Sequence, residues 1–348
     1  MAESKSPIKV EVSHKTVIFT AAFLIALWLV VQLKEIIVFL FLAAILLSAL
    51  LKPVELLNKK RIPRVLSLII IYVLVIGMIS LIIGIIIPPL ISQTSDFISK
   101  LPQIASTVNN FLIFNKIPTE NLSTIVSREA QNFAGNVISI SSAILSSVVL
   151  IVTLFVFTFY LILDWKTFVR LIASPFSGKQ EKKVISIISK VETGLGNWVR
   201  AQLSLSFTVG LLSFIGLTIL GFPFVLPLAL IAGIFEIVPI VGPIIAAIPA
   251  ILVGLSVSPI FGLAAIALYI VVQQLENHVI VPMIMSKVVG LQPPLVILAL
   301  LIGSKLGGIG GAFFAIPVIV VSKIIIKGLL YEDQKLEDGF PIEKYPTF

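Results

Sequence analysis

Four charged side chains stand inside an otherwise apolar third of the chain. Between residues 201 and 322 the only charged residues are Glu236, Glu276, Lys287 and Lys305. An ionised side chain is costly inside a lipid bilayer, so such residues usually face a pathway and have partners. A carboxylate in this setting can bind and release a proton or hold a desolvated cation. These residue types therefore predict an ion or solute pathway.

The densest polar cluster is the run Gln273–Gln274–Leu275–Glu276–Asn277–His278, which closes a long apolar stretch. Gln273 and Asn277 are four residues apart, so a helix places both on the face that also carries Gln274. Side chains that both donate and accept hydrogen bonds suit a polar solute or a desolvated cation. The alternatives are an interfacial helix end and a purely structural salt bridge. We interpret His278 as a helix-end residue rather than a ligand.

Two segments of the last third, 221–256 and 290–322, are similar to each other. Short motifs recur at an offset of 68 to 70 residues: Leu228–Ala229–Leu230 as Leu298–Ala299–Leu300, and Ala247–Ile248–Pro249 as Ala315–Ile316–Pro317. We interpret these segments as an internal duplication. Shared richness in Leu, Ile, Ala and Gly is the alternative explanation.

Each copy is interrupted near its middle by residues that break helices. The first copy contains Pro239, Gly242 and Pro243, and the second contains Gly307, Gly308, Gly310 and Gly311. The first copy leaves about 14 residues on each side, too few to cross ~30 Å of hydrocarbon at ~1.5 Å per residue. Interrupted segments at corresponding positions of a repeat are typical of transporter binding sites. Ordinary kinked spans are the alternative.

With an offset of 69, Glu236 and Lys305 occupy equivalent positions beside the two breaks. Opposite charges at equivalent positions predict a pair across the repeat interface or a shared ligand site. The candidate pathway residues are Glu236, Pro239, Gly242, Pro243, Gln273, Gln274, Glu276, Asn277, Lys305, Gly308 and Gly311. No metal site is expected among them.

The composition indicates which medium surrounds these residues. Of 348 residues, 58% are hydrophobic and only 12% are charged, whereas a soluble domain carries about 25% charged residues. No core can absorb so much apolar surface, because large domains still need a polar exterior. We therefore expect an all-α integral membrane protein. The chain has no cysteine, which excludes disulfides, thiolate metal sites and cysteine nucleophiles.

Long stretches without Asp, Glu, Lys or Arg predict a polytopic helical bundle of about eight membrane segments. They cover 16–33, 36–51, 65–95, 130–163, 201–235, 237–275, 288–304 and 306–322. We expect 16–33 to be an uncleaved first span. If each repeat copy is one broken span, the chain has eight spans. If each is a re-entrant hairpin, six spans remain and the hairpins enter from opposite faces; we prefer this arrangement because it places Lys287 on the cytoplasmic face.

Most of the 25 Lys and Arg residues lie in the first 15 residues, in 52–64, in 165–200 and in the tail. Cationic residues collect in cytoplasmic loops, so both termini and these two loops are predicted to be cytoplasmic. The net charge of +8 then reflects the orientation of the chain in the membrane, and nucleic acid is not an expected partner.

Apolar residues at helical spacing predict amphipathic helices at 93–113 and 184–198. Such helices would pack against the protein or the lipid interface, with a partner-binding or gating role as the alternative. Asp164 and Trp165, which close the fourth span, are interpreted as an interfacial anchor. We divide the chain into a scaffold at 1–200 with amphipathic segments at 89–136 and 165–198, a transport core at 201–330, and a cytoplasmic tail at 331–348.

The last third carries a set of short motifs. They are Trp198–Val199–Arg200–Ala201–Gln202, Gly221–Phe222–Pro223, Ile237–Val238–Pro239–Ile240–Val241–Gly242–Pro243, Gln274–Leu275–Glu276–Asn277, Val281–Pro282, Gly290–Leu291–Gln292–Pro293 and Ala315–Ile316–Pro317. Together they resemble the autoinducer-2 exporter family of prokaryotic membrane transporters, specifically over about 195–320. The resemblance implies a homo-oligomer in the inner membrane, whose members export a small quorum-sensing furanone or exchange Na⁺ for H⁺. Family members often carry Asn or another acidic residue where Glu236 stands.

We therefore expect a secondary transporter that moves a small polar solute or ion. A Na⁺(Li⁺)/H⁺ antiporter of the same family, a channel and a membrane scaffold are the alternatives. The expected partners are the lipid bilayer, a small polar solute or monovalent cation, and further copies of the chain. No cofactor is expected beyond a coupling ion, H⁺ or Na⁺. An enzyme is not expected, because the two histidines form no His-Glu-x-x-His motif and neither Gly-x-Ser-x-Gly nor a Walker A motif occurs.

Overall fold

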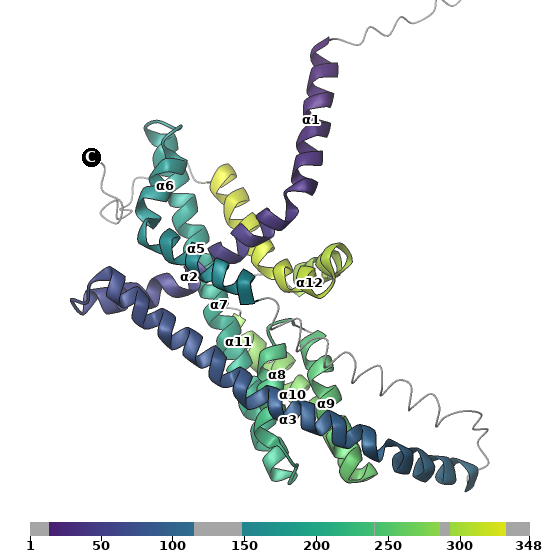
Figure 1. The fold of residues 1–348 in the computed structure, drawn as a ribbon. Coiled ribbons are helices and arrows are strands. Elements are labelled where there is room, and N and C mark those ends of the chain that lie inside the picture. The colour runs from purple at the N-terminus through teal and green to yellow at the C-terminus, as the bar shows by residue number, and fades with distance from the viewer. Residues whose placement is uncertain (1–13, 115–147, 240, 286–292, 332–348) are drawn as a thin grey trace, which may run out of the picture.

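The computed structural model describes residues 14–114, 148–239, 241–285 and 293–331, and these residues form helices and no strand. The predicted all-α class is confirmed. The helices, in chain order, are α1 (His14–Gln32), α2 (Lys34–Lys59), α3 (Arg64–Phe114), α5 (Val148–Leu163), α6 (Trp165–Ala173), α7 (Lys179–Ile219), α8 (Val225–Phe235), α9 (Val241–Val257), α10 (Pro259–Leu275), the π-helical turn η1 (Glu276–Ile280), α11 (Val281–Met285) and α12 (Pro293–Tyr331) (Figure 1).

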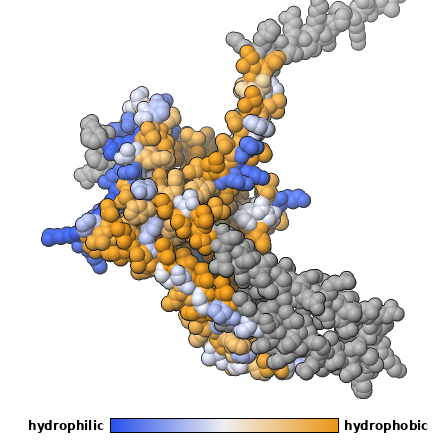
Figure 2. Space-filling model, in the orientation of Figure 1, coloured by the Kyte–Doolittle hydropathy of each residue, from blue (hydrophilic) through white to orange (hydrophobic). Residues whose placement is uncertain are grey.

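Apolar side chains cover much of the outside of these helices (Figure 2). On α3, for example, Val73 is 67% exposed and Leu81 is 62% exposed. Such a surface is unfavourable in water and suits a hydrocarbon environment. Among the described residues, five helices are long and apolar enough to cross a membrane, or six if α5 and α6 form one bent span. The chain is thus a multi-pass membrane protein, while the count of eight membrane segments stays a prediction.

Two helices are longer than predicted, because each covers two segments that the sequence analysis treated as distinct elements. Helix α7 combines the predicted amphipathic helix 184–198 with the predicted fifth span in 41 continuous residues, about 60 Å at ~1.5 Å per residue. Helix α3 likewise combines the predicted third span with the predicted helix at 93–113. The proposed domain boundary at 200 therefore falls inside a helix. The rest of the 89–136 segment, from residue 115 on, lies outside the described residues, and so does the predicted tail from residue 332.

The first half of α7 packs against α2 and the end of α12. Leu195 and Trp198 are buried in a cluster with Ile45 of α2 and with Ile316 and Val320 of α12. The apolar stripe predicted for this part of α7 therefore contacts protein rather than the lipid interface. This packing fixes the helix that reaches the predicted pathway.

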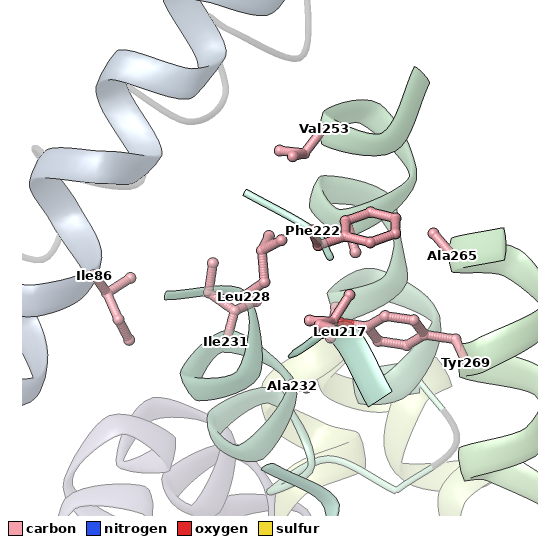
Figure 3. Packing of buried hydrophobic residues seen from close by; sticks show 11 residues of the cluster. Ile86, Leu217, Phe222, Leu228, Ile231, Ala232, Val253, Ala265 and Tyr269 are labelled. Carbon is pink, nitrogen blue, oxygen red and sulfur yellow. The ribbon is translucent and has the colours of Figure 1, made fainter. Parts of the chain in front are cut away.

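Helices α8 and α9 lie between α3, α7 and α10. Their shared core consists of Ile86, Leu217, Phe222, Leu228, Ile231, Ala232, Ala246, Ala250, Val253, Ala265 and Tyr269 (Figure 3). Helix α8 has 11 residues, which reach about 17 Å and cannot cross ~30 Å of hydrocarbon. The first repeat copy is thus interrupted after Phe235, close to the predicted breakers.

The second repeat copy is interrupted inside α12. Gly307 and Gly308 leave the helical conformation, and Gly308 has φ 59° and ψ −139°. Residues with a Cβ avoid this region, so only glycine makes the reversal without strain. The two limbs of α12 then fold back on each other. Their shared core is formed by Ala299, Leu300, Ala312 and Ala315.

The two breaks share one geometric feature. A Cβ added to Gly242 would collide with the carbonyl oxygen of Phe235, and a Cβ added to Gly311 would collide with the carbonyl oxygen of Gly303. Gly242 and Gly311 are equivalent positions of the predicted repeat. Each copy therefore reverses where a glycine touches the backbone of the preceding limb. That the two copies re-enter the membrane from opposite faces stays a prediction.

Candidate functional site

Glu236 is the innermost ionisable residue of the predicted pathway. It follows the last residue of α8, where the first break begins, and its side chain is 0% exposed. Neither carboxyl oxygen has a hydrogen-bond partner among the described residues. Buried polar groups are normally hydrogen-bonded, so an exception requires an explanation. A carboxyl group without a partner can take a proton or a cation.

Glu276 is the second buried carboxyl group, 3% exposed, and it begins the π-helical turn η1. Its Oε2 accepts a hydrogen bond of 3.0 Å from Nε2 of Gln273. The same amide lies 3.5 Å from Oδ1 of Asn277. π-Helical turns are rare and occur frequently at functional sites. The polar run predicted from the sequence thus lies at a distorted helix junction.

The break at Glu236 and the π-helical turn at Glu276 meet. The two carboxyl groups are close enough to interact electrostatically, although they form no hydrogen bond of ordinary geometry. Two buried carboxylates at short range repel each other unless a proton or cation compensates their charge. The sequence predicted both residues as candidates but did not predict that they meet.

Gln202 of α7 supports the break from outside the repeat. Its Nε2 donates a hydrogen bond of 2.7 Å to the backbone oxygen of Glu236. A helix end leaves such carbonyl groups without an intrahelical partner, and this amide satisfies one of them. Gln202 Oε1 and Ser206 Oγ, one turn further along α7, are buried without a hydrogen-bond partner among the described residues. Sequence reasoning missed Gln202 as a site residue; an amide inside an apolar span was the available signal.

The breaker residues connect this site to the second repeat copy. Pro239 and Pro243 are half-buried and Gly242 is buried around the first turn. Val238, in the same turn, packs against the α12 core. The first break therefore packs against the core of the folded second copy.

The predicted pair between Glu236 and Lys305 is not formed. Glu236 is fully buried next to Glu276, whereas Lys305 is exposed on α12, two residues before Gly307. The expectation was wrong because equivalent repeat positions do not fix side-chain directions. Gly308 is also exposed, at the tip where α12 reverses.

The remaining residues of the polar run lie at its edge. Gln274 and Asn277 are exposed, whereas Gln273 is half-buried beside Glu276. Nδ1 of the exposed His278 lies 3.0 Å from the backbone oxygen of Gln274. This contact within one helix fits the interpretation of His278 as a helix-end residue.

Replacing Gln202 with Leu is expected to lower the thermal stability of the purified protein and to slow transport. The change leaves the carbonyl group of Glu236 buried and unpaired, which costs about 1–3 kcal/mol. Unfolding monitored by fluorescence in detergent measures the stability. Gln274→Leu is the matched control, since this amide is exposed. Equal unfolding temperatures for both variants and the starting protein would contradict the role of Gln202.

Comparison with known proteins decides the family. The family described as "AI-2E family transporter" matches residues 17–330. The chain belongs to the AI-2E transporter family. This match covers most of the chain, including both repeat copies and every residue of the carboxyl site, and it confirms the resemblance seen in the sequence motifs.

Curated relatives of this AI-2E transporter are named for transport. Two come from Bacillus subtilis and are named "Putative transport protein": YrrI is 29% identical over 295 residues, 81% of this chain and 84% of its own, and YueF is 28% identical over 289 residues, 78% of each. The relative YhhT of Escherichia coli strain K12 is 24% identical over 246 residues, 68% of this chain and 69% of its own. The family and the relatives' names support a transport role rather than an enzymatic one.

Proposed function

We propose that this AI-2E transporter is a secondary transporter of a small polar solute, with autoinducer-2 as the candidate substrate and the Glu236–Glu276 pair as the site of the coupling ion. The observation that carries the proposal is a fully buried carboxyl group at a backbone break, which has no hydrogen-bond partner among the described residues and lies next to a second buried carboxyl group. No catalytic role is needed for either residue.

The coupling ion that fits this pair best is a proton. One proton removes one of the two like charges, so the singly protonated pair can stay in a dry site. When the pair has lost this proton, burying two ionised carboxylates costs free energy unless water or a cation enters the site. Proton binding therefore favours the closed conformation of the break, and proton loss favours a hydrated one. Solute movement can couple to this equilibrium because the break forms the wall of the proposed pathway.

A Na⁺(Li⁺)/H⁺ antiporter is the second candidate. It is favoured by two oxygen acceptors on α7 that have no hydrogen-bond partner among the described residues. They are Oε1 of Gln202, whose amide also contacts the first break, and Oγ of Ser206 one turn away. Hard monovalent cations bind to carboxylate, amide and hydroxyl oxygens, in keeping with the preference of hard metals for oxygen ligands. The same two carboxylates would then alternate between a proton and a sodium ion.

The membrane arrangement that we propose has both termini in the cytoplasm of a prokaryotic cell and the repeat copies as re-entrant hairpins. The basic residues of the 52–64 and 165–200 loops support this orientation. The folded-back limbs on either side of Phe235 and of Gly308 support the hairpins. The family resemblance supports a homo-oligomer.

Transport by the purified protein in liposomes tests the proposal. We expect saturable counterflow of labelled autoinducer-2 that accelerates when a pH gradient is imposed. Sodium-driven proton movement without any solute effect would favour the antiporter. Conductance without saturation would indicate a channel, and no flux of any tested solute or ion would contradict a transport function.

A further inference from the structure

The helix pair α5 and α6 lies outside the carboxyl site and has a separate feature. Helix α5 ends at Leu163, and α6 leaves it at an angle of 75°. Helix α6 lies against α7, next to the end of α5 (Figure 1). The 16 residues of α5 reach about 24 Å, most of the thickness of a bilayer core. The bend therefore occurs where the span formed by α5 leaves the hydrocarbon core and reaches the headgroup region.

Helix α6 presents three different faces. Val169 and Ala173 are 0% exposed and pack against the protein. Phe168, Leu171 and Ile172 are exposed, with Leu171 at 68%. These three side chains form an exposed apolar stripe on α6. An exposed apolar stripe on so short a helix, next to a membrane span, is typical of helices that lie in the interface.

The basic residues of α6 lie on the other side. At about 100° per residue, Lys166 and Arg170 fall roughly opposite Leu171 and its neighbours. Lys179 and Lys182 follow in the first turn of α7 and are exposed. Basic side chains opposite an apolar stripe place cations at headgroup level when the stripe faces acyl chains.

Trp165 fixes α6 in this orientation. Its Nε1 donates a hydrogen bond of 2.8 Å to Glu192 Oε2 on α7. Its ring stacks on Phe168, with the ring centroids 5.9 Å apart. Tryptophan favours the boundary between acyl chains and water. The first residue of α6 is thus anchored to protein on α7, and its ring contacts one residue of the exposed apolar stripe, Phe168.

We propose that α6 lies in the cytoplasmic membrane interface and that Lys166, Arg170, Lys179 and Lys182 form a binding site for anionic phospholipid headgroups. Charge complementarity selects this partner, because each basic residue near a negatively charged leaflet contributes attraction that salt weakens. The apolar stripe supplies the contact with acyl chains. This proposal is independent of the transported solute.

Local lipid composition next to α6 can be measured directly, because the chain has no cysteine. A Leu171→Cys variant carries one fluorophore, and the protein is placed in nanodiscs that contain nitroxide-labelled phosphatidylglycerol or nitroxide-labelled phosphatidylcholine at equal fractions. We expect quenching by phosphatidylglycerol to be stronger by about twofold or more, from the attraction of several basic residues. Replacing Lys166 and Arg170 with Gln should bring the ratio close to one.

The matched control replaces Lys59 and Lys60 with Gln, which removes the same charge from the end of α2 and should leave the ratio unchanged. Three outcomes would overturn the proposal. They are equal quenching by both lipids in the starting variant, a ratio that falls as much in the control, and a fluorophore shielded from both lipids. The last outcome would mean that protein, such as a second copy of the chain, covers the apolar stripe.

Discussion

Glu276→Gln is expected to abolish the acceleration of transport by a pH gradient, while downhill solute exchange stays measurable. Glutamine keeps the shape of the side chain and can still accept from Gln273, but it cannot change its charge. Without a titratable partner, the pair no longer exchanges one proton per cycle. The expected loss of the gradient response is at least about tenfold, because the variant lacks one of the two interacting carboxyl groups whose shared proton the gradient drives. The measurement is counterflow in proteoliposomes with and without the gradient.

A buried carboxyl group elsewhere provides the control. Glu192 is also buried, and it accepts a hydrogen bond from Trp165 at the α6–α7 contact. Glu192→Gln should keep the gradient response, because this residue lies outside the site. Glu236→Gln should weaken the response less than Glu276→Gln does, since the family resemblance implies that an uncharged Asn can stand in place of Glu236. An unchanged gradient response in Glu276→Gln would make that carboxyl group structural.

The second large effect concerns the two glycines at the breaks. Gly242→Ala and Gly311→Ala are expected to reduce transport by at least about tenfold, because each added Cβ collides with backbone rather than with a flexible side chain. Backbone carbonyl groups cannot move aside without reshaping the turn. Each substitution therefore destabilises the native turn by overpacking, at about 1–3 kcal/mol or more. Flux per correctly inserted protein is the quantity to measure, with insertion checked by protease protection.

Gly310→Ala is the matched control in the same reversal. A Cβ at Gly310 meets no atom of the described residues within 4 Å, so this variant should transport at close to the starting rate. Normal flux in Gly242→Ala and Gly311→Ala would show that the breaks tolerate extra volume and that the folded limbs do not shape the pathway. Loss of flux in all three variants would indicate a general intolerance of the helix pairs to substitution.

The carboxyl residues and the breaks could be predicted because their signals are local. A Glu in an apolar segment and a cluster of Pro or Gly are visible in a short window of sequence. The pairing of Glu236 with Glu276 could not be predicted, because they are 40 positions apart in the chain and two helices, α9 and α10, lie between them. The incorrect pairing with Lys305 used only the repeat offset, which says nothing about where a folded limb directs its side chains.

Gln202 and the π-helical turn illustrate two further limits. The amide of Gln202 reaches a carbonyl group 34 residues away, and only tertiary packing brings the two together. The π-helical turn at Glu276 depends on hydrogen-bond register, which the residue types do not encode. The continuity of α7, in contrast, could be predicted at this junction, because Trp198, Val199 and Arg200 include no Pro or Gly that would end a helix.

The continuity of α7 between Leu195 and Gln202 has a mechanical consequence. Near its middle this helix packs against the second limb of α12 through Leu195 and Trp198, and one turn further along it holds the first break through Gln202. Because a continuous helix moves nearly as a rigid body, a slide or rotation of α7 alters its contacts with both interrupted segments in the same event. The two interrupted segments are therefore mechanically coupled to each other. An inside gate and an outside gate built from them would change state together rather than independently.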